Sequence, residues 1–473
     1  MSKKVVVAKS KLNNIGDAIR NQLGVTTKYT LDEMPAKIDS ITGGSGGGKS
    51  GVKLVINTTS PDLYGKTVYV TDGDKTVSGK FSNSGVCILN GIDMNGEVTI
   101  KAVVDGEEYT TTAVVHSTYE TDFDLVSTKI YGVQWNGAMS PQFARTDDAI
   151  GLADPVPAVN GGIGSSPFDS IYPWSKMDIV EDADLGTFVK IPKFYFKWTG
   201  DGETSLKLQI SGVQHEGFLT CPACMDRGDG QGERDYVLVG RYLSNVNHRS
   251  KTGETPIRNV SFNDAKTGSE AIGNGVHIID YMTNLTIQML YLVEYAYGNC
   301  RSKIGRGLRD TFGVTGVTDN MLYHTGTTGA KTDFAAVQYR NIEDIWSNLS
   351  PWIDGVKFSN GGLAVSKDLV NYEYLGSTIT GNQIYGTFYF ANKNGFEWVI
   401  MPKTGVGWSQ SDSERSPLGD GWGNGGMSEG KHYCIGGRYN ADNEWWLMGI
   451  FMYWGVMSDS GQSYIGSRII KLP

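Results

Sequence analysis

The sequence predicts a multidomain α+β protein: a short helical module, a β-sandwich and one large, loop-rich domain. Its 473 residues suffice for about two to four domains of ordinary size. Glycine accounts for 62 residues and tryptophan for 11, while charged residues make up only 20%. Such a composition is typical of β structure with long loops, and not of a disordered chain or a coiled coil.

The charge balance and the cysteine count exclude several classes of protein. With 42 basic and 51 acidic residues the formal net charge is −9, so we expect no binding to nucleic acid, which requires a basic surface. Five cysteines are too few for a dense disulfide framework, and their odd number leaves one thiol unpaired. No apolar run approaches the roughly 18 residues of a membrane span, and Val5 to Ala8 is too short for a signal peptide. We therefore expect a soluble chain made in a reducing cytoplasm.

Residues 1–42 have the pattern of a helical attachment or oligomerisation module. Apolar residues recur at helical spacing in residues 10–23 and Gly24 follows as a stop signal, which predicts one amphipathic helix. Thr30 and Glu33 are spaced as a capping box that begins a second helix. Two short helices with one apolar stripe each cannot bury themselves, so we expect them to pack on copies of the chain or on a larger assembly.

Residues 43–50, GGSGGGKS, fit the phosphate-loop pattern G-x-x-x-x-G-K-S. A phosphate loop leaves a buried strand and enters a helix whose N-terminal amides bind the phosphates. Here a predicted helix precedes the motif and the strand-like Val52 to Ile56 follows it. The context therefore favours a flexible Gly/Ser linker over a nucleotide site.

Residues 51–120 alternate apolar and polar side chains in short runs, among them Thr67 to Val70 and Val98 to Val104. Asp72-Gly73 and Asp105-Gly106 supply hairpin turns between such runs. Short strands and turn signals at this spacing predict an immunoglobulin-like β-sandwich that acts as a spacer. We expect Cys87 to be a buried apolar filler.

From residue 125 to 473 the chain is aromatic and punctuated by glycine, which predicts one large domain with insertions. One helix is expected in it, over Thr283 to Tyr297. Five of its apolar residues share one face at helical spacing. They are Leu285, Met289, Leu292, Val293 and Ala296.

Two cysteine-containing segments have some features of a chemical site. Cys221 and Cys224 form a C-x-x-C pair with His215 six residues earlier, but a structural zinc site needs four ligands and no second pair exists. Zinc binding, a local disulfide or redox pair and two packed thiols remain open, and the packed thiols are favoured. Cys434 lies two residues after His432, so a strand places both on one face, yet no third group orients them as a nucleophile and base.

The glycine-rich segment 225–235, MDRGDGQGERD, holds acidic residues that calcium would accept as ligands. It lacks the spacing of an EF-hand loop, so a solvated surface loop is favoured. We expect no catalytic residue, no metal and no cofactor in the chain. A glycan hydrolase would need two placed carboxylates, and no motif indicates such a pair.

Several segments resemble one known family. Tyr339 to Gly355, YRNIEDIWSNLSPWIDG, resembles the YRGIEN…GN-x-W-x-W-x-DG stretch of C-type-lectin-like domains of the formylglycine-generating type. Asn341 and Ser347 replace glycines of that pattern. The ending from Ile435-Gly436-Gly437 to the IGSR segment at 465–468 is also similar to this group, which recurs in bacteriophage tail proteins. Segments 239–242, 275–281, 287–295 and 29–35 resemble phage tail proteins too.

The resemblance implies a C-type-lectin-like fold for residues 125–473 with an exposed ligand-binding face between Arg438 and Tyr464. Rigid aromatic rings and adaptable polar groups are the mixture that antibody paratopes use, and it also suits sugar rings. Strand alternation must nevertheless send at least one of the tryptophans inward. The expected ligand-binding residues are Tyr439, Asn440, Asp442, Asn443, Trp445, Trp446, Tyr453, Trp454, Asp459 and Tyr464.

The implied function is that of a phage tail-associated receptor-binding protein of the virion, which grips a bacterial surface glycan or protein without chemistry. Residues 1–42 would join other tail proteins, and the usual assembly of tail fibres implies a homotrimer. The alternative is a structural baseplate or tail-tip component that binds another virion protein. Formylglycine-generating enzymes share the fold and rely on a reactive cysteine pair. This chain has only Cys434 near its C-terminus, so the pair is missing there.

Members of this group are often diversified by retroelements through adenine-directed mutagenesis. That mechanism does not yield Trp, Met or Glu, so residues such as Glu444 and Met448 would have to be fixed by the template. Diversification therefore remains open for this chain. The candidate variable positions are Tyr439, Asn440, Asp442, Asn443, Tyr453, Asp459, Ser460 and Tyr464.

Overall fold

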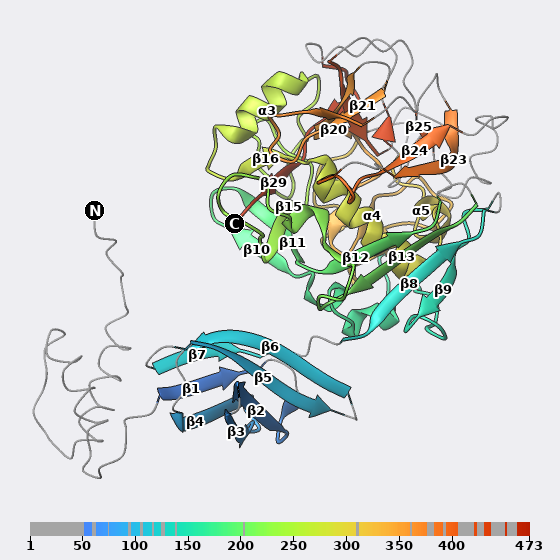
Figure 1. Cartoon of the computed structure of the whole chain (residues 1–473). Coiled ribbons are helices and arrows are strands. Elements are labelled where there is room, and N and C mark those ends of the chain that lie inside the picture. Colours follow the sequence, from blue (N-terminus) through green and yellow to red (C-terminus); the bar gives the residue numbers. More distant parts are fainter. Residues whose placement is uncertain are drawn as a thin grey trace, which may run out of the picture. The chain divides into compact units, whose positions relative to one another are not determined.

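The structure, a computed structural model, divides into two compact units, Met1–Val126 (unit 1) and Ser127–Pro473 (unit 2) (Figure 1). The predicted helical module and the phosphate-loop-like linker, residues 1–50, lie outside the described residues. The described residues are 52–58, 63–73, 75–92, 96–104, 107–115, 118–123, 128–137, 140–201, 204–308, 312–359, 362–375, 383–390, 394–404, 421–422, 430–436, 450–451 and 461–473.

The described residues of unit 1 form two sheets that enclose one apolar core. The smaller sheet has the strand order β4–β1–β7 and the larger has the order β3–β2–β5–β6 (Figure 1). Strand β1 pairs antiparallel with β4 and parallel with β7. The strands are β1 (Val52–Asn57), β2 (Thr67–Asp72), β3 (Lys75–Lys80), β4 (Val86–Ile92), β5 (Gly96–Val104), β6 (Glu107–Val115) and β7 (Thr118–Asp122).

Alternating side chains of both sheets build this core, as the sequence pattern predicts. Leu54 and Ile56 enter it from one sheet and Val70 and Ile100 from the other, and all four are fully buried. Cys87 is also buried there, which confirms its role as an apolar filler. The core therefore lies between the two sheets.

Both predicted hairpins of unit 1 are present. Asp72 pairs with Lys75 across the first turn, where Gly73 has a φ of 52° that a glycine adopts without strain. Across the second turn, Val104 pairs with Glu107. Turn chemistry thus sets the register of β2 with β3 and of β5 with β6.

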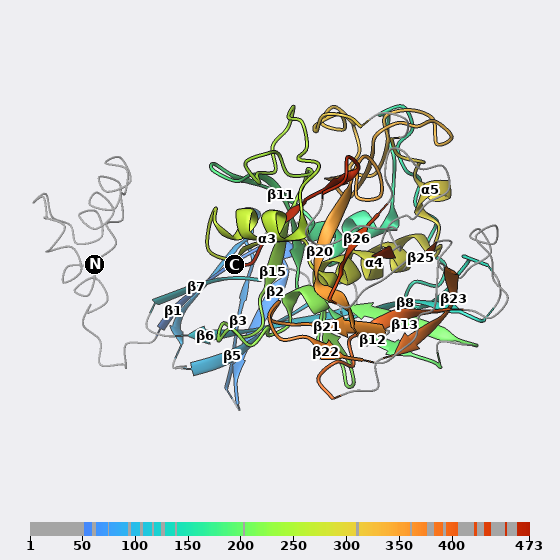
Figure 2. The ribbon, with the colours of Figure 1, turned by 90° about the horizontal axis from the view of Figure 1, so that it is seen from above.

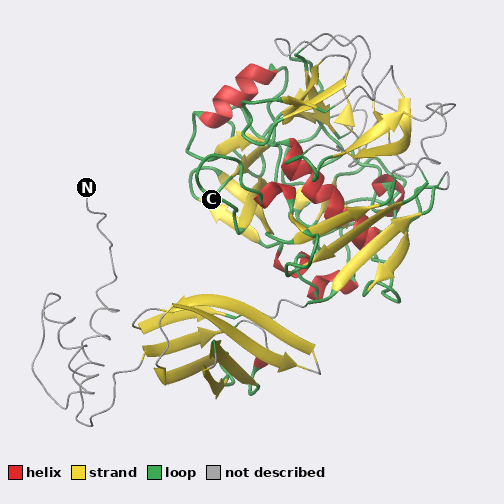
Figure 3. Ribbon diagram, in the orientation of Figure 1, coloured by secondary structure: helices red, strands yellow, loops and turns green. Residues whose placement is uncertain are grey.

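Unit 2 is built mostly of strands joined by long loops, with few helices (Figure 3). Two five-stranded sheets have the orders β10–β11–β15–β29–β16 and β14–β12–β13–β8–β9. Their strands are β8 (Ile130–Trp135), β9 (Ala144–Asp147), β10 (Ile179–Asp182), β11 (Gly186–Pro192), β12 (Tyr195–Thr199), β13 (Leu206–Ser211), β14 (Leu219–Thr220), β15 (Tyr236–Gly240), β16 (Val276–Ile278) and β29 (Ile469–Lys471).

A third sheet of unit 2 has the order β22–β21–β20–β26–β27, and β28 pairs with the start of β20. Two three-stranded sheets have the orders β17–β18–β19 and β24–β23–β25. Their strands are β17 (Gly326–Thr327), β18 (Val337–Tyr339), β19 (Ile342–Glu343), β20 (Ser350–Ser359), β21 (Gly362–Val365), β22 (Glu373–Tyr374), β23 (Gln383–Phe390), β24 (Ile400–Thr404), β25 (Gly421–Trp422), β26 (His432–Ile435), β27 (Ile450–Phe451) and β28 (Ile465–Gly466).

Helix α4 (Tyr281–Tyr295) confirms the predicted helix, which begins two residues earlier than expected. The side chain of Asp280 caps its N-terminus by accepting from the Thr283 amide, and Ala296, with a φ of 49°, ends it. All fifteen residues of α4 are buried, and Figures 1 and 2 both place it among the sheets of unit 2. The five residues expected on one face are buried, and so is the rest of α4, because α4 is a core helix surrounded by protein.

Two further helices lie among the described residues of unit 2, where the sequence predicted one in all. Helix α3 (Phe262–Glu270) begins at Ser261, whose side chain accepts from the Asp264 amide. Helix α5 (Cys300–Lys303) is a single turn capped by Asn299. Both are short and polar on one side, so apolar periodicity alone does not reveal them.

No helix of the described residues is long and apolar enough to cross a membrane.

Candidate functional site

Nine of the ten expected ligand-binding residues, from Tyr439 to Asp459, lie outside the described residues. The tenth, Tyr464, is described and is only 6% exposed. It packs in a cluster with Trp352 and Ile465, so its assignment to an exposed face is wrong. Whether an aromatic residue at the end of a loop contacts a ligand or packs in the core depends on its neighbours in space, which the local sequence does not show.

Strand β20 holds both ends of the segment 437–463, which contains those nine residues. Upstream of the segment, β26 pairs antiparallel with β20, with Trp352 opposite Cys434. Downstream of it, β28 pairs parallel with β20, with Ser350 opposite Ile465. Since both ends attach to one buried strand, the segment leaves and rejoins the framework at the same place.

Ser350 makes the closest connection between the two ends. Its amide donates to the Tyr464 carbonyl at 2.9 Å, and its hydroxyl makes a long hydrogen bond of 3.5 Å to the Gly436 carbonyl. Gly436 has a φ of 69°, and a Cβ there would lie 2.6 Å from the Ile345 carbonyl oxygen. A glycine is therefore required where the segment leaves β26.

The described part of the segment extends this sheet. Strand β27, Ile450–Phe451, pairs antiparallel with β26, so that Cys434 lies opposite Phe451. The segment thus begins and ends at buried strands, and its described residues Ile450 and Phe451 pair with β26. A rigid framework that carries a long connection is the usual arrangement of recognition loops.

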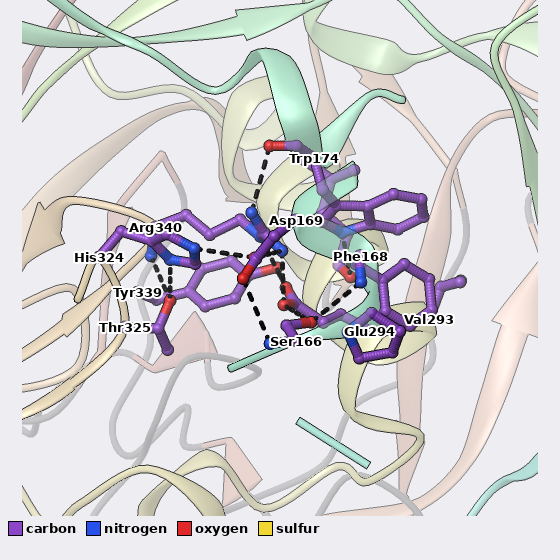
Figure 4. A network of polar contacts seen from close by, with 12 residues as sticks. Ser166, Phe168, Asp169, Trp174, Val293, Glu294, His324, Thr325, Tyr339 and Arg340 are labelled. Carbon is purple, nitrogen blue, oxygen red and sulfur yellow. Dashed lines mark hydrogen bonds and ion pairs between the residues drawn. The ribbon is translucent and has the colours of Figure 1, made fainter. Parts of the chain in front are cut away.

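A network of buried ion pairs lies around Glu294, near the end of α4 (Figure 4). The Arg340 guanidinium donates to both carboxylate oxygens of Glu294, at 2.8 and 2.6 Å. Tyr339 and Ser166 donate to the same carboxylate, each at 2.9 Å. Arg340 also donates to the Trp174 carbonyl at 3.1 Å. Three segments far apart in sequence, which contain Ser166, Glu294 and Tyr339-Arg340, therefore meet at one carboxylate.

Asp169 and His324 form the outer part of this network (Figure 4). The Asp169 carboxylate lies 2.9 Å from Nε2 of His324, accepts from the Tyr323 hydroxyl at 2.7 Å and pairs with Arg340 at 3.2 Å. Burial would raise the pKa of Asp169, but hydrogen bonds from His324 and Tyr323 lower it to about 2. The side chains of Asp169 and His324 are 35% and 24% exposed.

This network fits a structural role. Arg340 and Glu294 are 3% and 1% exposed, so no ligand reaches them, and their hydrogen bonds are satisfied within the protein. The sequence analysis did not identify it. The available signal is that Glu294 is the one charged residue in α4. A lone carboxylate in an otherwise uncharged buried helix requires a cationic partner.

The two segments that carry the family resemblance meet in the interior of unit 2. Arg468, from the IGSR segment, is fully buried and donates to the main-chain carbonyls of Gly240, Arg241 and Glu343. Burial lowers the pKa of Arg468 to about 10, although Asp344 and Glu343 oppose this shift. The motif residues thus form part of the buried framework of unit 2.

Glu343 and Asp344 are adjacent buried carboxylates of that framework. Glu343 accepts from the Gly316 amide at 2.8 Å and from the Thr318 amide and hydroxyl at 2.9 and 2.7 Å. Burial, and then the charge of Asp344, raise the pKa of Glu343 to about 7. Asp344 accepts from the Ser347 hydroxyl at 2.7 Å.

The other candidates of the sequence analysis lie in structural settings. Cys221 and Cys224 are buried thiols, and the hydrogen bond that the Cys224 thiol makes with Cys221, then burial, raise the pKa of Cys224. His215 contacts the Ser211 hydroxyl at 3.0 Å. No group of three or more metal-ligating residues occurs within the described residues. The packed-thiol interpretation therefore agrees best with the geometry.

The loop 225–235 is fastened by two arginines that point inward. Arg227 pairs with the buried Asp280 at 2.5 Å, and Arg234 pairs with Asp229. Each arginine is at most 5% exposed. Asp229 thus serves as an ion-pair partner within the loop.

Cys434 is 2% exposed and packs beside Trp352, whereas His432 stacks on Phe262. Neither arrangement is that of a nucleophile beside its base.

No protein-family model matches the sequence, and no curated protein matches it either.

Proposed function

We propose that the chain is a phage tail-associated receptor-binding protein that recognises a bacterial surface glycan or protein through the segment 437–463. The observation that carries this proposal is that β20 holds both ends of a segment rich in aromatic, Asn and Asp residues. Two fixed ends reduce the conformational freedom that a loop has to lose on binding. Aromatic rings in it supply contact area at low entropic cost.

The proposed architecture assigns one role to each part of the chain. Residues 1–42 attach a homotrimer to other tail proteins, an immunoglobulin-like sandwich acts as the spacer, and a C-type-lectin-like domain displays the binding face. Individually weak sites then act together, because a trimer on a virion holds them at high effective concentration. The chain performs no catalysis in this proposal. Whether a retroelement varies the face is a question for sequences of related chains.

The test is binding of the fluorescently labelled full chain to a panel of intact Gram-positive bacteria. The variant Tyr439→Ala, Trp446→Ala, Tyr453→Ala is measured beside it. We expect the full chain to bind a narrow set of strains and the triple variant to lose at least tenfold in affinity. The matched control is Tyr69→Ala, which removes an aromatic side chain that is 40% exposed in unit 1.

Absence of binding to every strain by the folded chain, even after artificial multimerisation, would contradict the proposal. In that case the alternative, a baseplate or tail-tip component that binds another virion protein, would be tested by capture of virion proteins on the immobilised chain. Equal losses in the triple variant and in Tyr69→Ala would place the binding face elsewhere.

A further inference from the structure

A second glycine lies near the end at which the segment 437–463 rejoins the framework. Gly436, at the upstream end, approaches the main chain of Ile345. Gly461, near the downstream end, approaches a different part of unit 2: a Cβ added to it would overlap main-chain atoms of Asn259 and Val260. Main-chain atoms cannot turn aside as the end of a flexible side chain can. A glycine is therefore required at Gly461, where the segment passes directly over residues 259–260.

Residues 257–261, which lead into α3, make this contact, and we call them the α3 connection. The Asn259 amide donates to the Gln462 carbonyl at 3.1 Å. The same carbonyl accepts from the Ile465 amide, at the start of β28, at 3.0 Å. One carbonyl of the segment is thus bound from two sides. The α3 connection therefore holds the downstream end in addition to β20.

The α3 connection is itself fixed in place. At its start, the Ile257 amide donates to the Ser244 carbonyl at 2.7 Å. The Val260 carbonyl accepts from Nε1 of Trp352, a fully buried residue of β20, at 2.9 Å. At its end, Ser261 caps α3. The connection thus joins the buried strand β20 to the place where the segment returns.

Asn259 adopts a backbone conformation that few residue types tolerate. Its φ is 56°, in the left-handed region, and the residue is exposed. Asparagine and glycine enter this region readily, whereas a β-branched side chain there is strained. A residue that avoids this conformation changes the course of the main chain at its contact with Gly461 and Gln462.

We propose that Asn259 and Gly461 are positioning residues of the receptor-binding segment, whose main-chain contact sets where the segment 437–463 rejoins the framework and so how it meets the receptor. This inference rests on the proposed function and adds the α3 connection to β20 as a support of the binding segment. Fixed ends pre-organise a loop for binding. When only a fraction of the molecules hold the competent arrangement, the affinity falls by that fraction.

The test compares Asn259→Ile with the matched control Asn160→Ile in the full chain. Asn160 is also exposed, has a φ of 54°, and its amide also donates to a main-chain carbonyl, that of Gly329, at 2.9 Å. Both variants should lower the urea midpoint of unit 2 to a similar extent. Adhesion to a bacterial strain that the unmodified chain binds should weaken roughly tenfold in Asn259→Ile alone. Asn259→Gly, which adopts the left-handed conformation freely, should retain adhesion.

Gly461→Ala disrupts the same contact from the other side. Its control is Gly273→Ala, because a Cβ on Gly273 would meet its nearest neighbour, the Val276 side chain, at an ordinary 3.5 Å. We expect Gly461→Ala to weaken adhesion about as much as Asn259→Ile, and Gly273→Ala to leave it unchanged. The double variant of Asn259 and Gly461 should be little worse than either single variant, since both remove one contact. Gly461→Ala also provides the test if Asn259→Ile does not fold.

Hydrogen exchange measures the contact without a receptor. The peptide that covers residues 461–466 contains the Ile465 amide, which shares the Gln462 carbonyl with Asn259. Its exchange should be faster in Asn259→Ile than in the unmodified chain, and unchanged in Asn160→Ile. Unchanged exchange in Asn259→Ile would overturn the inference, and so would equal losses of adhesion in Asn259→Ile and Asn160→Ile.

The two measurements separate this inference from the proposed function. A chain that adheres to bacteria equally well with and without Asn259→Ile contradicts the positioning role alone. A chain that adheres to no strain, while exchange at residues 461–466 responds to Asn259→Ile, contradicts the receptor-binding proposal and leaves the contact as the determinant of where the segment rejoins the framework.

Discussion

At the scale of single residues, Arg340 joins segments that lie far apart in sequence. Its guanidinium contacts Glu294, Asp169 and the Trp174 carbonyl, which are separated from it by 46, 171 and 166 residues in sequence. Arginine suits this position because its planar fork donates to both oxygens of Glu294 at once. The pair is buried, so removal of one partner leaves the other charge without compensation.

We therefore expect Arg340→Met to destabilise unit 2 by about 3–5 kcal/mol, because the Glu294 carboxylate would remain buried and unpaired. Arg340→Met with Glu294→Leu should be less damaging than Arg340→Met alone. The measurement is urea unfolding followed by tryptophan fluorescence, which reports unit 2 because all 11 tryptophans lie after residue 126.

Lys193→Met is the control for Arg340→Met. It breaks an ion pair of 3.2 Å with Asp235, whose side chain is 88% exposed, and should cost less than about 1 kcal/mol. Similar losses from Lys193→Met and Arg340→Met would show that the buried network contributes no more than a surface pair.

At the scale of elements, α4 differs most from its expected environment. An amphipathic helix would turn Thr286 to solvent, but Thr286 is fully buried. Its hydroxyl donates to the Met282 carbonyl at 2.8 Å and accepts from the Ala223 amide at 3.0 Å. The Thr286 hydroxyl thus bonds to main-chain groups of the protein instead of water.

Thr286→Lys should destabilise unit 2 by more than about 3 kcal/mol, because it places an unpaired charge in the core. Thr267 of α3 provides a matched control, since its hydroxyl makes the same kind of bond, to the Asn263 carbonyl at 2.7 Å, on an exposed face. Thr267→Lys should change stability by less than about 0.5 kcal/mol. Equal effects of the two substitutions in urea unfolding would contradict the burial of Thr286 in the core.

Local patterns predicted those elements whose determinants lie close together in sequence. The turn at Asp72-Gly73 and the existence of α4 are examples, because adjacent residues decide both. The pairing of Glu294 with Arg340 depends on how the chain returns on itself, and no local pattern encodes that. Tyr464 shows the same limit. Its residue type suits a binding face, but its neighbours in space place it in the core.

At the scale of the whole molecule, two buried groups give the stability of unit 2 opposite dependences on pH. Glu343 has a folded-state pKa of about 7, above its ordinary value of 4.5, so its contribution to stability is lost as the pH rises through that window. His432 has a folded-state pKa of about 4, below its ordinary value of 6.5, so its contribution is lost as the pH falls. The two slopes oppose each other between pH 4.5 and 6.5.

Single substitutions should reveal how each of the two groups makes the unfolding free energy depend on pH. With Glu343→Gln, the unfolding free energy should rise between pH 4.5 and 6.5 relative to the unmodified chain, by about 1–3 kcal/mol. With His432→Gln it should fall over the same range by a similar amount. Urea unfolding at pH 4.5, 5.5 and 6.5 checks both, and parallel profiles for all three proteins would exclude these titrations as determinants of stability.

The position of β29 has a consequence for the order of folding. This strand lies between β15 and β16, and it pairs Ile470 with both Val239 and His277. β29 is synthesised after its sheet partners, so β15 and β16 cannot be joined until Lys471 has left the ribosome. A sheet completed by its latest strand has high contact order, which slows folding. During synthesis the facing edges of β15 and β16 stay open, and neighbouring nascent chains can pair with them.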